Sequence, residues 1–302
     1  MHDTIHGREM CDTELRSLKD IFVAELLSHS AGDNLAVRER MKYLEIPFDS
    51  KYCVFVARQL PCEEEANRAE LEKALAPLLP GAIFVSHPDG LVIVCFFKGK
   101  DRFEDSEQLK VWAHSVKKVS KEYRVALGVS REEFSMAKLE SAYTCAFRSI
   151  EIGLRVQNNK RQWPSGPEPV KPLSDFNVFL YRDFEVYLLL EYVFISRARI
   201  LEQNRCICGL YEIRQNDTAK KTNDLDLLRT YLLFDCSASK TAAAMYMHRN
   251  NVTYRIARIQ SALGFDIKDQ QNRFLLTMGY YLIDLYGTDC LDILANPTAS
   301  EV

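Results

Sequence analysis

The side chains best suited to specific chemistry lie together in and just before the segment from Thr241 to Leu263. Apolar residues recur there at helical spacing, at Val252, Ile256, Ile259 and Leu263, which predicts one helix face packed against a core. The other positions carry the basic, amide, hydroxyl and aromatic side chains that meet base edges and phosphate oxygens. The candidate DNA-binding residues are Lys240, Thr241, His248, Arg249, Asn250, Asn251, Thr253, Tyr254, Arg255 and Arg258. The pattern predicts a helix-turn-helix whose second helix reads double-stranded DNA.

The charge distribution supports a local contact with a polyanion. The formal net charge of the chain is -3, which argues against a protein that coats nucleic acid with its whole surface. Between Cys236 and Phe265, however, the sequence has no Asp or Glu, although about four would be expected at the average acidity of the chain. A basic segment of this kind favours a nucleic-acid partner.

Three helices must hold these side chains in place. A helix beginning at Asp224, with that residue as its cap, is expected to pack beneath the other two. Ser237 or Ser239 would cap the second helix, where three consecutive alanines allow a close crossing. Asn250 or Asn251 would cap the third, so that its positively polarised end approaches phosphate.

An alternative explains the same residues without any partner: the basic helix is a solvated surface, and the alanine run is a good helix former. For an arbitrary chain this explanation is favoured by about three to one. Here Asn250, Asn251, Thr253 and Tyr254 are indifferent helix formers without an apolar role, yet they crowd the first turns of a helix. Binding explains that crowding better than stability does.

The upstream half of the sequence has the pattern of a small α/β domain. The expected order is strand, helix, two strands joined by the turn His87-Pro88-Asp89-Gly90, helix, strand and a long helix. The corresponding ranges are 52–57, 63–79, 82–85, 91–97, 106–121, 124–129 and 136–156. This order is that of a ferredoxin-like or palm sheet with helices on one face. The proline-rich stretch 163–172 is expected to be a loop that precedes a last edge segment.

The fold class is therefore α+β, an α/β domain followed by an all-α helix-turn-helix domain. The expected division is a helical lead-in at 1–50, the α/β domain at 51–180, connecting helices at 181–222, the helix-turn-helix domain at 223–290 and a tail at 291–302. The apolar stretch from Phe184 to Ile195 is either a dimer interface or ordinary core, and the sequence leaves both open.

Neither a metal site nor secretion is indicated. The nine cysteines are scattered, and the one close pair, Cys206 and Cys208, has no further ligands at metal-binding spacing. The six histidines show no paired spacing for zinc, so we expect no metal and no cofactor. Without a signal-peptide core or a membrane-length apolar run, a cytoplasmic protein with reduced thiols is expected.

The C-terminal residues resemble a known family. Leu227 to Leu232, Thr241-Ala242, His248-Arg249-Asn250, Tyr254-Arg255-Ile256 and Leu263-Gly264 resemble the helix-turn-helix of PucR/CdaR-type bacterial transcriptional regulators. Asn251 and Ile256 depart from the usual Thr and Leu of that pattern. The α/β region looks like the GGDEF-like domain that precedes this helix-turn-helix, whereas the large N-terminal sensory domain of many relatives is not found.

The resemblance implies a sequence-specific DNA-binding transcriptional regulator, homodimeric, that controls a catabolic operon in response to a small-molecule effector. It does not imply an enzyme. A GGDEF-type cyclase needs metal-binding carboxylates near the first strand and a Gly-Gly-acid-acid hairpin, whereas this chain has Ala57-Arg58 and a hairpin with only Asp89. The alternative function is a non-catalytic metabolite-binding or protein-interaction module that does not bind DNA.

Overall fold

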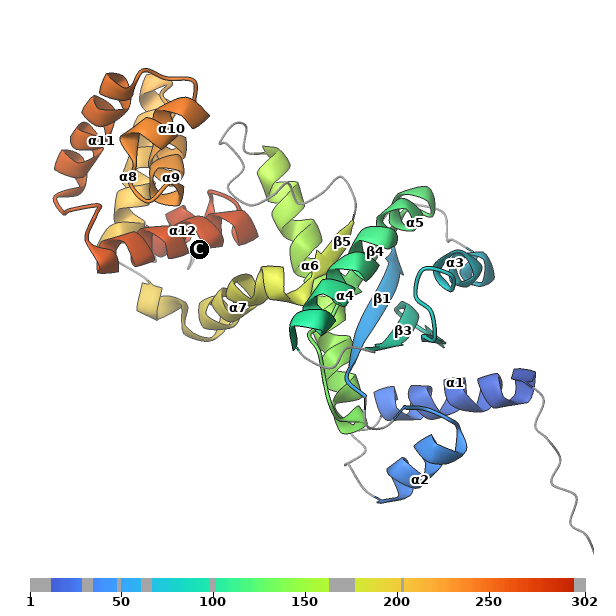
Figure 1. Ribbon diagram of the computed structural model, residues 1–302. Coiled ribbons are helices and arrows are strands. Elements are labelled where there is room, and N and C mark those ends of the chain that lie inside the picture. Colours follow the sequence, from blue (N-terminus) through green and yellow to red (C-terminus); the bar gives the residue numbers. More distant parts are fainter. Residues whose placement is uncertain are drawn as a thin grey trace, which may run out of the picture. The chain divides into compact units, whose positions relative to one another are not determined.

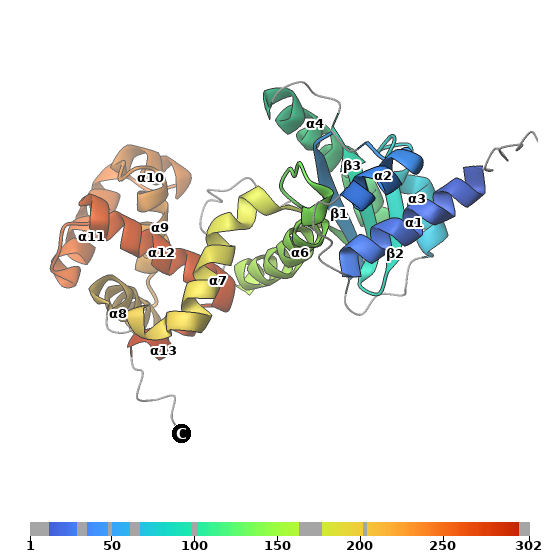
Figure 2. The same cartoon turned by 90° about the horizontal axis from the view of Figure 1, so that it is seen from below.

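The computed structural model describes residues 12–28, 35–47, 50–60, 67–97, 102–162, 177–201 and 204–295 (Figures 1 and 2). The chain forms two compact units. The first holds the described residues up to Glu151 together with 177–183, and the second holds residues 152–162 and those from Phe184 onward. The whole loop expected at 163–172, the first eleven residues and the end of the tail lie outside the described residues.

The first unit is built on a five-stranded sheet in the order β2-β3-β1-β4-β5. Its strands are β1 (Tyr52–Gln59), β2 (Ile83–His87), β3 (Gly90–Phe96), β4 (Val125–Val129) and β5 (Val178–Leu180). All neighbouring strands are antiparallel except β4 and β5, with Val56 opposite Val92 on one side and Gly128 on the other. The predicted ferredoxin-like order is thus present, and β5 is the expected edge segment.

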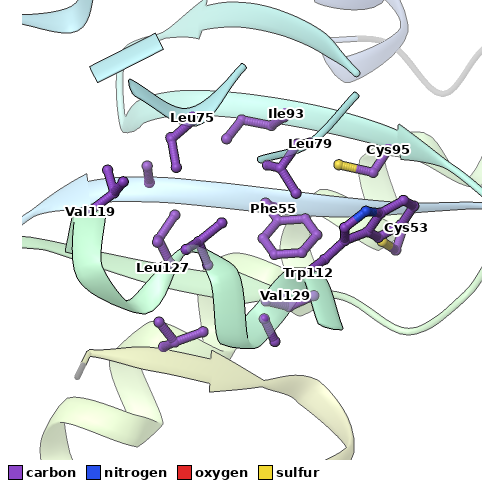
Figure 3. Close-up of a cluster of buried hydrophobic side chains, with 14 of the residues drawn as sticks. Cys53, Phe55, Leu75, Leu79, Ile93, Cys95, Trp112, Val119, Leu127 and Val129 are labelled. Carbon is purple, nitrogen blue, oxygen red and sulfur yellow. The ribbon is translucent and has the colours of Figure 1, made fainter. Parts of the chain in front are cut away.

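One face of this sheet carries the main core of the unit. Helices α3 (Arg68–Leu75), α4 (Arg102–Ser115) and α5 (Lys117–Glu122) supply buried side chains that pack on β1, β3 and β4. Figure 3 shows Trp112 of α4 close to Phe55 of β1 within this layer. Because alternate strand residues point to opposite faces, the core contains Phe55 and Leu127 but not their neighbours in sequence.

The other face is covered too, contrary to the expectation of helices on one face only. The long helix α6 (Leu139–Gln162), which follows the short 3₁₀ helix η1 (Met136–Lys138), packs on β4 at Gly128. A β-carbon on Gly128 would lie 1.9 Å from the carbonyl oxygen of Ala146, so only glycine permits this approach. Of the lead-in helices α1 (Asp12–Ser28) and α2 (Leu35–Tyr43), α1 contacts β2 and belongs to the same unit.

The second unit is helical. It contains α7 (Tyr181–Leu201) from Phe184 onward, α8 (Arg205–Lys220), α9 (Asp224–Leu233), α10 (Ala238–Ala244), α11 (Arg249–Leu263), α12 (Gln270–Tyr286) and α13 (Cys290–Ala295). Helix α8, which the sequence analysis assigned to the connecting helices, contacts α9, α11, α12 and α13 and is the central helix of the bundle (Figures 1 and 2).

Two glycines permit close helix contacts within the bundle. A β-carbon on Gly209 would lie 2.4 Å from Leu263, and one on Gly279 would lie 2.4 Å from Leu210. Of the three alanines expected to serve this purpose, only Ala242 is buried. The three-alanine crossing was therefore wrong in its extent, because a seven-residue helix presents only one of three successive positions to its neighbours.

Candidate nucleic-acid interface

Helices α10 and α11 form the predicted helix-turn-helix, and each begins at a defined cap. Ser237 caps α10, since its Oγ accepts a hydrogen bond from the backbone N–H of Lys240 at 3.4 Å. His248 caps α11, since its Nδ1 accepts from the backbone N–H of Asn250 at 3.2 Å. The prediction that Asn250 or Asn251 is the cap was wrong: both lie inside the first turn, where their side chains are exposed.

The apolar face of α11 is buried as the sequence predicted, except that Leu263 is only half-buried. Val252, Ile256 and Ile259 are buried in the core of the bundle. The opposite face of the first turns is exposed and polar, and it lies at the positively polarised end of the helix. The exposed candidate residues are Lys240, His248, Arg249, Asn250, Asn251, Thr253, Tyr254 and Arg258.

Arg255 is not part of this exposed surface. Its Nε and Nη2 donate to Asp224 Oδ1 at 2.8 and 2.6 Å, and Nη2 also donates to Asn223 Oδ1 at 2.7 Å. Only 14% of the Arg255 side chain is exposed. The prediction that Arg255 is available to DNA therefore disagrees with the structure, because packing brings a carboxylate from α9 to a segment that has none of its own.

Arg258 shares the same carboxylate. Its Nη2 lies 2.5 Å from Asp224 Oδ2, but 49% of its side chain is exposed. Asp224, whose side chain is 10% exposed, thus holds two arginines of α11 on α9. We call Asp224, Arg255 and Arg258 the arginine clamp. It ties α9 to α11, and it leaves the Arg258 side chain exposed enough for a second contact.

The predictions for Asp224 as a helix cap and for Thr241 as a DNA contact also fail, because both side chains make contacts inside the bundle. Asp224 does not cap α9; Asp217 of α8 does so, since its Oδ1 and Oδ2 accept from the N–H groups of Asp224 and Leu225, each at 2.8 Å. Thr241 is fully buried, and its hydroxyl donates to the carbonyl of Ser237 at 2.9 Å. It therefore stabilises α10 and faces no partner.

The turn between the two helices contains an exposed residue, Tyr246, that is not among the predicted DNA-binding residues. Tyr246 follows the last turn of α10 with a φ of 53°, and it is 98% exposed. A left-handed backbone costs a non-glycine residue about 1 kcal/mol. No sequence pattern predicts this exposure, because an aromatic residue between two methionines is typical of a buried core.

A buried polar cluster ties α7 to the bundle. Asp284 of α12 accepts from the Tyr187 hydroxyl at 3.0 Å and from Arg229 of α9 at 2.8 Å. Burial, together with the Asp284 carboxylate, raises the pKa of Tyr187 well above its ordinary value, so this hydroxyl stays protonated. Arg155 of α6 and Glu191 of α7 add an ion pair at 2.7 Å.

The apolar stretch 184–195, for which a dimer interface and ordinary core were both open, has one buried and one exposed apolar face in α7. Phe184, Tyr187 and Leu190 are buried, as core residues would be. Val186, Leu189 and Tyr192 are instead exposed along the other face. Side chains beyond Tyr192 in this helix are not described.

A second polar cluster lies at the β2–β3 hairpin of the α/β unit. The Tyr143 hydroxyl donates to Asp89, and it lies 3.3 Å from His87 Nδ1. A hollow of about 250 Å³ beside it is lined by Arg58, Arg68 and Asp89 among others. No group of three or more His, Cys, Asp or Glu side chains in the described part of the chain is placed to hold a metal.

Comparison with known proteins identifies both regions. Residues 225–282 match the PucR C-terminal helix-turn-helix domain, and residues 28–152 match the GGDEF-like domain. Both matches are to domains of the two kinds that the residue pattern predicted. No helix among the described residues has the length and apolar character needed to cross a membrane.

Two Bacillus subtilis (strain 168) proteins are similar to parts of the chain. The proline-responsive transcriptional activator PutR is 23% identical over 53% of this chain and 34% of its own length. The purine catabolism regulatory protein is 36% identical over 21% of this chain and 13% of its own length. The chain thus spans about a third or less of these relatives. A regulator of polyketide synthase expression from Bifidobacterium adolescentis is 17% identical over 89% of this chain and 98% of its own, with a TM-score of 0.38.

Proposed function

We propose that this protein is a sequence-specific DNA-binding transcriptional regulator that docks α11 in the major groove. The observation that carries this proposal is the exposed, polar first turns of α11 on a helix whose other face is buried. We assign Asn250 and Asn251 to base edges, since a side-chain amide can form two hydrogen bonds with one adenine. Lys240, His248, Arg249 and Arg258 are assigned to phosphates.

We further propose that the protein acts in the cytoplasm and has no catalytic activity. The single carboxylate at the hairpin supports the second point, because a cyclase needs acidic groups for its metal ions. The names of the relatives, a proline-responsive activator and a purine catabolism regulator, support control of a catabolic operon by a metabolite. In this proposal the GGDEF-like unit serves dimerisation or signal input.

A homodimer is part of the proposal, since one recognition helix reads only a few base pairs and two placed about 34 Å apart multiply specificity. The exposed apolar face of α7, with Val186, Leu189 and Tyr192, is the surface we assign to the second copy. Leu189→Glu should shift the molar mass in light scattering from dimer to monomer. A dimer that survives this change contradicts the assignment.

The DNA-binding test is fluorescence anisotropy on DNA from upstream of the gene, with salt titrated. Asn250→Ala should weaken binding to the preferred site by roughly tenfold and reduce its preference over unrelated DNA. Arg249→Ala should lower the salt slope by about one. Asn216→Ala is the matched control, because Asn216 is an exposed asparagine of α8. Wild-type affinity and slope in both α11 variants would refute the docking model.

A further inference from the structure

Tyr246 has an unusual combination of backbone conformation and exposure. The C-terminus of α10 closes with a pair of hydrogen bonds: the N–H of Met247 donates to Ala242 O at 2.9 Å, and that of Tyr246 donates to Ala243 O at 3.4 Å. This is a Schellman motif, in which the residue with positive φ is usually glycine. Here the position is taken by a tyrosine with a φ of 53°.

The same unit ends α11 with a glycine in the left-handed region, since Gly264 has a φ of 73° and a ψ of 16°. Among the described non-glycine residues with positive φ, Tyr246 is the one aromatic residue. Its ring contributes nothing to the core, since 98% of the residue is exposed. Both the backbone conformation and the exposure are unfavourable for tyrosine, so neither folding nor packing explains its presence.

The position of Tyr246 relates it to the recognition helix. It precedes the His248 cap by two residues, so their Cα atoms are at most about 7 Å apart. When the first turn of α11 enters a groove, the exposed ring is therefore within reach of the DNA backbone that borders this groove. A phenol offers that strand a hydroxyl donor for a phosphate oxygen and an apolar face for the deoxyribose.

We propose that Tyr246 is a DNA-contacting residue, which donates its hydroxyl to a backbone phosphate beside the groove that receives α11 and packs its ring on the adjacent sugar. This inference rests on the proposed DNA-binding function. It assigns to the turn a contact that positions the protein on DNA and is separate from base reading by α11. It also accounts for an exposed aromatic residue with a strained backbone at a position that glycine usually occupies.

The decisive variant is Tyr246→Gly, for which stability and binding should change in opposite directions. Relief of the left-handed strain should raise Tm by a few degrees or leave it unchanged. Loss of the contact should weaken DNA binding by roughly fivefold or more. A residue with a purely structural role would not lose affinity while the protein becomes more stable.

Two further variants separate the parts of the contact. Tyr246→Phe removes only the hydroxyl. It should lower the affinity for the preferred site and for unrelated DNA by the same factor, because phosphates carry no sequence information. Its salt slope should equal that of the wild type, since an uncharged hydroxyl displaces no counterion. Asp235→Gly is the backbone control, because Asp235 has the same positive φ at the end of α9 and is exposed. It should bind at least as well as the wild type, since it loses a negative charge.

The outcomes are distinguishable. Wild-type affinity for Tyr246→Gly, on DNA that Asn250→Ala binds weakly, overturns the inference and leaves the proposed function standing. An equal loss of affinity in Asp235→Gly also overturns it, because loosening of a helix end would then explain the effect. If the wild-type protein shows no salt-dependent DNA binding at all, the proposed function and this inference fail together.

Discussion

Removal of the Asp224 carboxylate should destabilise the helical unit by about 3 kcal/mol. The buried pair with Arg255 makes the larger contribution, since breaking such a pair by removing one partner costs roughly 3 to 5 kcal/mol. The pair with Arg258 adds roughly 0 to 1 kcal/mol, because half of that side chain is in solvent. We take the lower end of the sum, since the freed Arg255 can still turn toward water.

Hydrogen exchange followed by mass spectrometry is the appropriate assay, because the chain has two units whose unfolding need not be a single transition. Amides of α9 and α11 that exchange through unfolding of the helical unit should exchange about a hundredfold faster in Asp224→Ala. Peptides of β1, β3 and β4 should exchange at the wild-type rate. Asp235→Ala is the matched control, since the exposed pair of Asp235 with Arg273 contributes little.

A double-mutant cycle with Arg255→Ala shows whether the loss belongs to the pair. The coupling energy should be roughly 2 kcal/mol, so that the second substitution costs much less once the first has been made. Arg255→Ala should also leave the salt slope of DNA binding unchanged, unlike Arg249→Ala. If Asp224→Ala exchanges no faster than Asp235→Ala, or if Arg255→Ala lowers the salt slope, Arg255 is free for DNA and the arginine clamp does not exist in solution.

Three further outcomes follow from buried groups. Gly128→Ala should destabilise the sheet unit by about 1 to 3 kcal/mol, because its β-carbon would lie 1.9 Å from the Ala146 carbonyl oxygen; calorimetry should show a lowered transition, and an unchanged one would contradict the α6 packing. Val252→Asp should abolish the folded helical unit in circular dichroism, since it places a charge at a fully buried position, and a wild-type spectrum would contradict the assigned inner face. Burial raises the pKa of Cys290 from 9.0 to about 12, so the unfolded thiol ionises first. The free energy of unfolding should therefore be intact below about pH 9 and fall as pH rises toward about 12. Urea midpoints measured across this range should show the fall, and Cys290→Ala should reduce it.

Much of the site could be predicted because its pattern is local. The spacing of Val252, Ile256 and Ile259 determines the buried face of α11 whatever that face packs against. The strand order of the α/β unit was likewise predictable, since hairpin and crossover rules leave few arrangements for six alternating elements. The family resemblance rested on the same local residues, and the matching domains confirm it.

The sequence by itself thus determined most of the elements, the resemblance to PucR-type regulators and the polar character of the exposed face of α11. Only the tertiary structure decided which of those polar side chains remain available. Arg255 pairs with a carboxylate 31 positions away, and Thr241 is enclosed by neighbouring helices. The backbone of Tyr246 turns left-handed to join two packed helices. Periodicity records which side of a helix faces inward, whereas a charge partner and a turn conformation depend on how separate helices pack, and that information is not local in the chain.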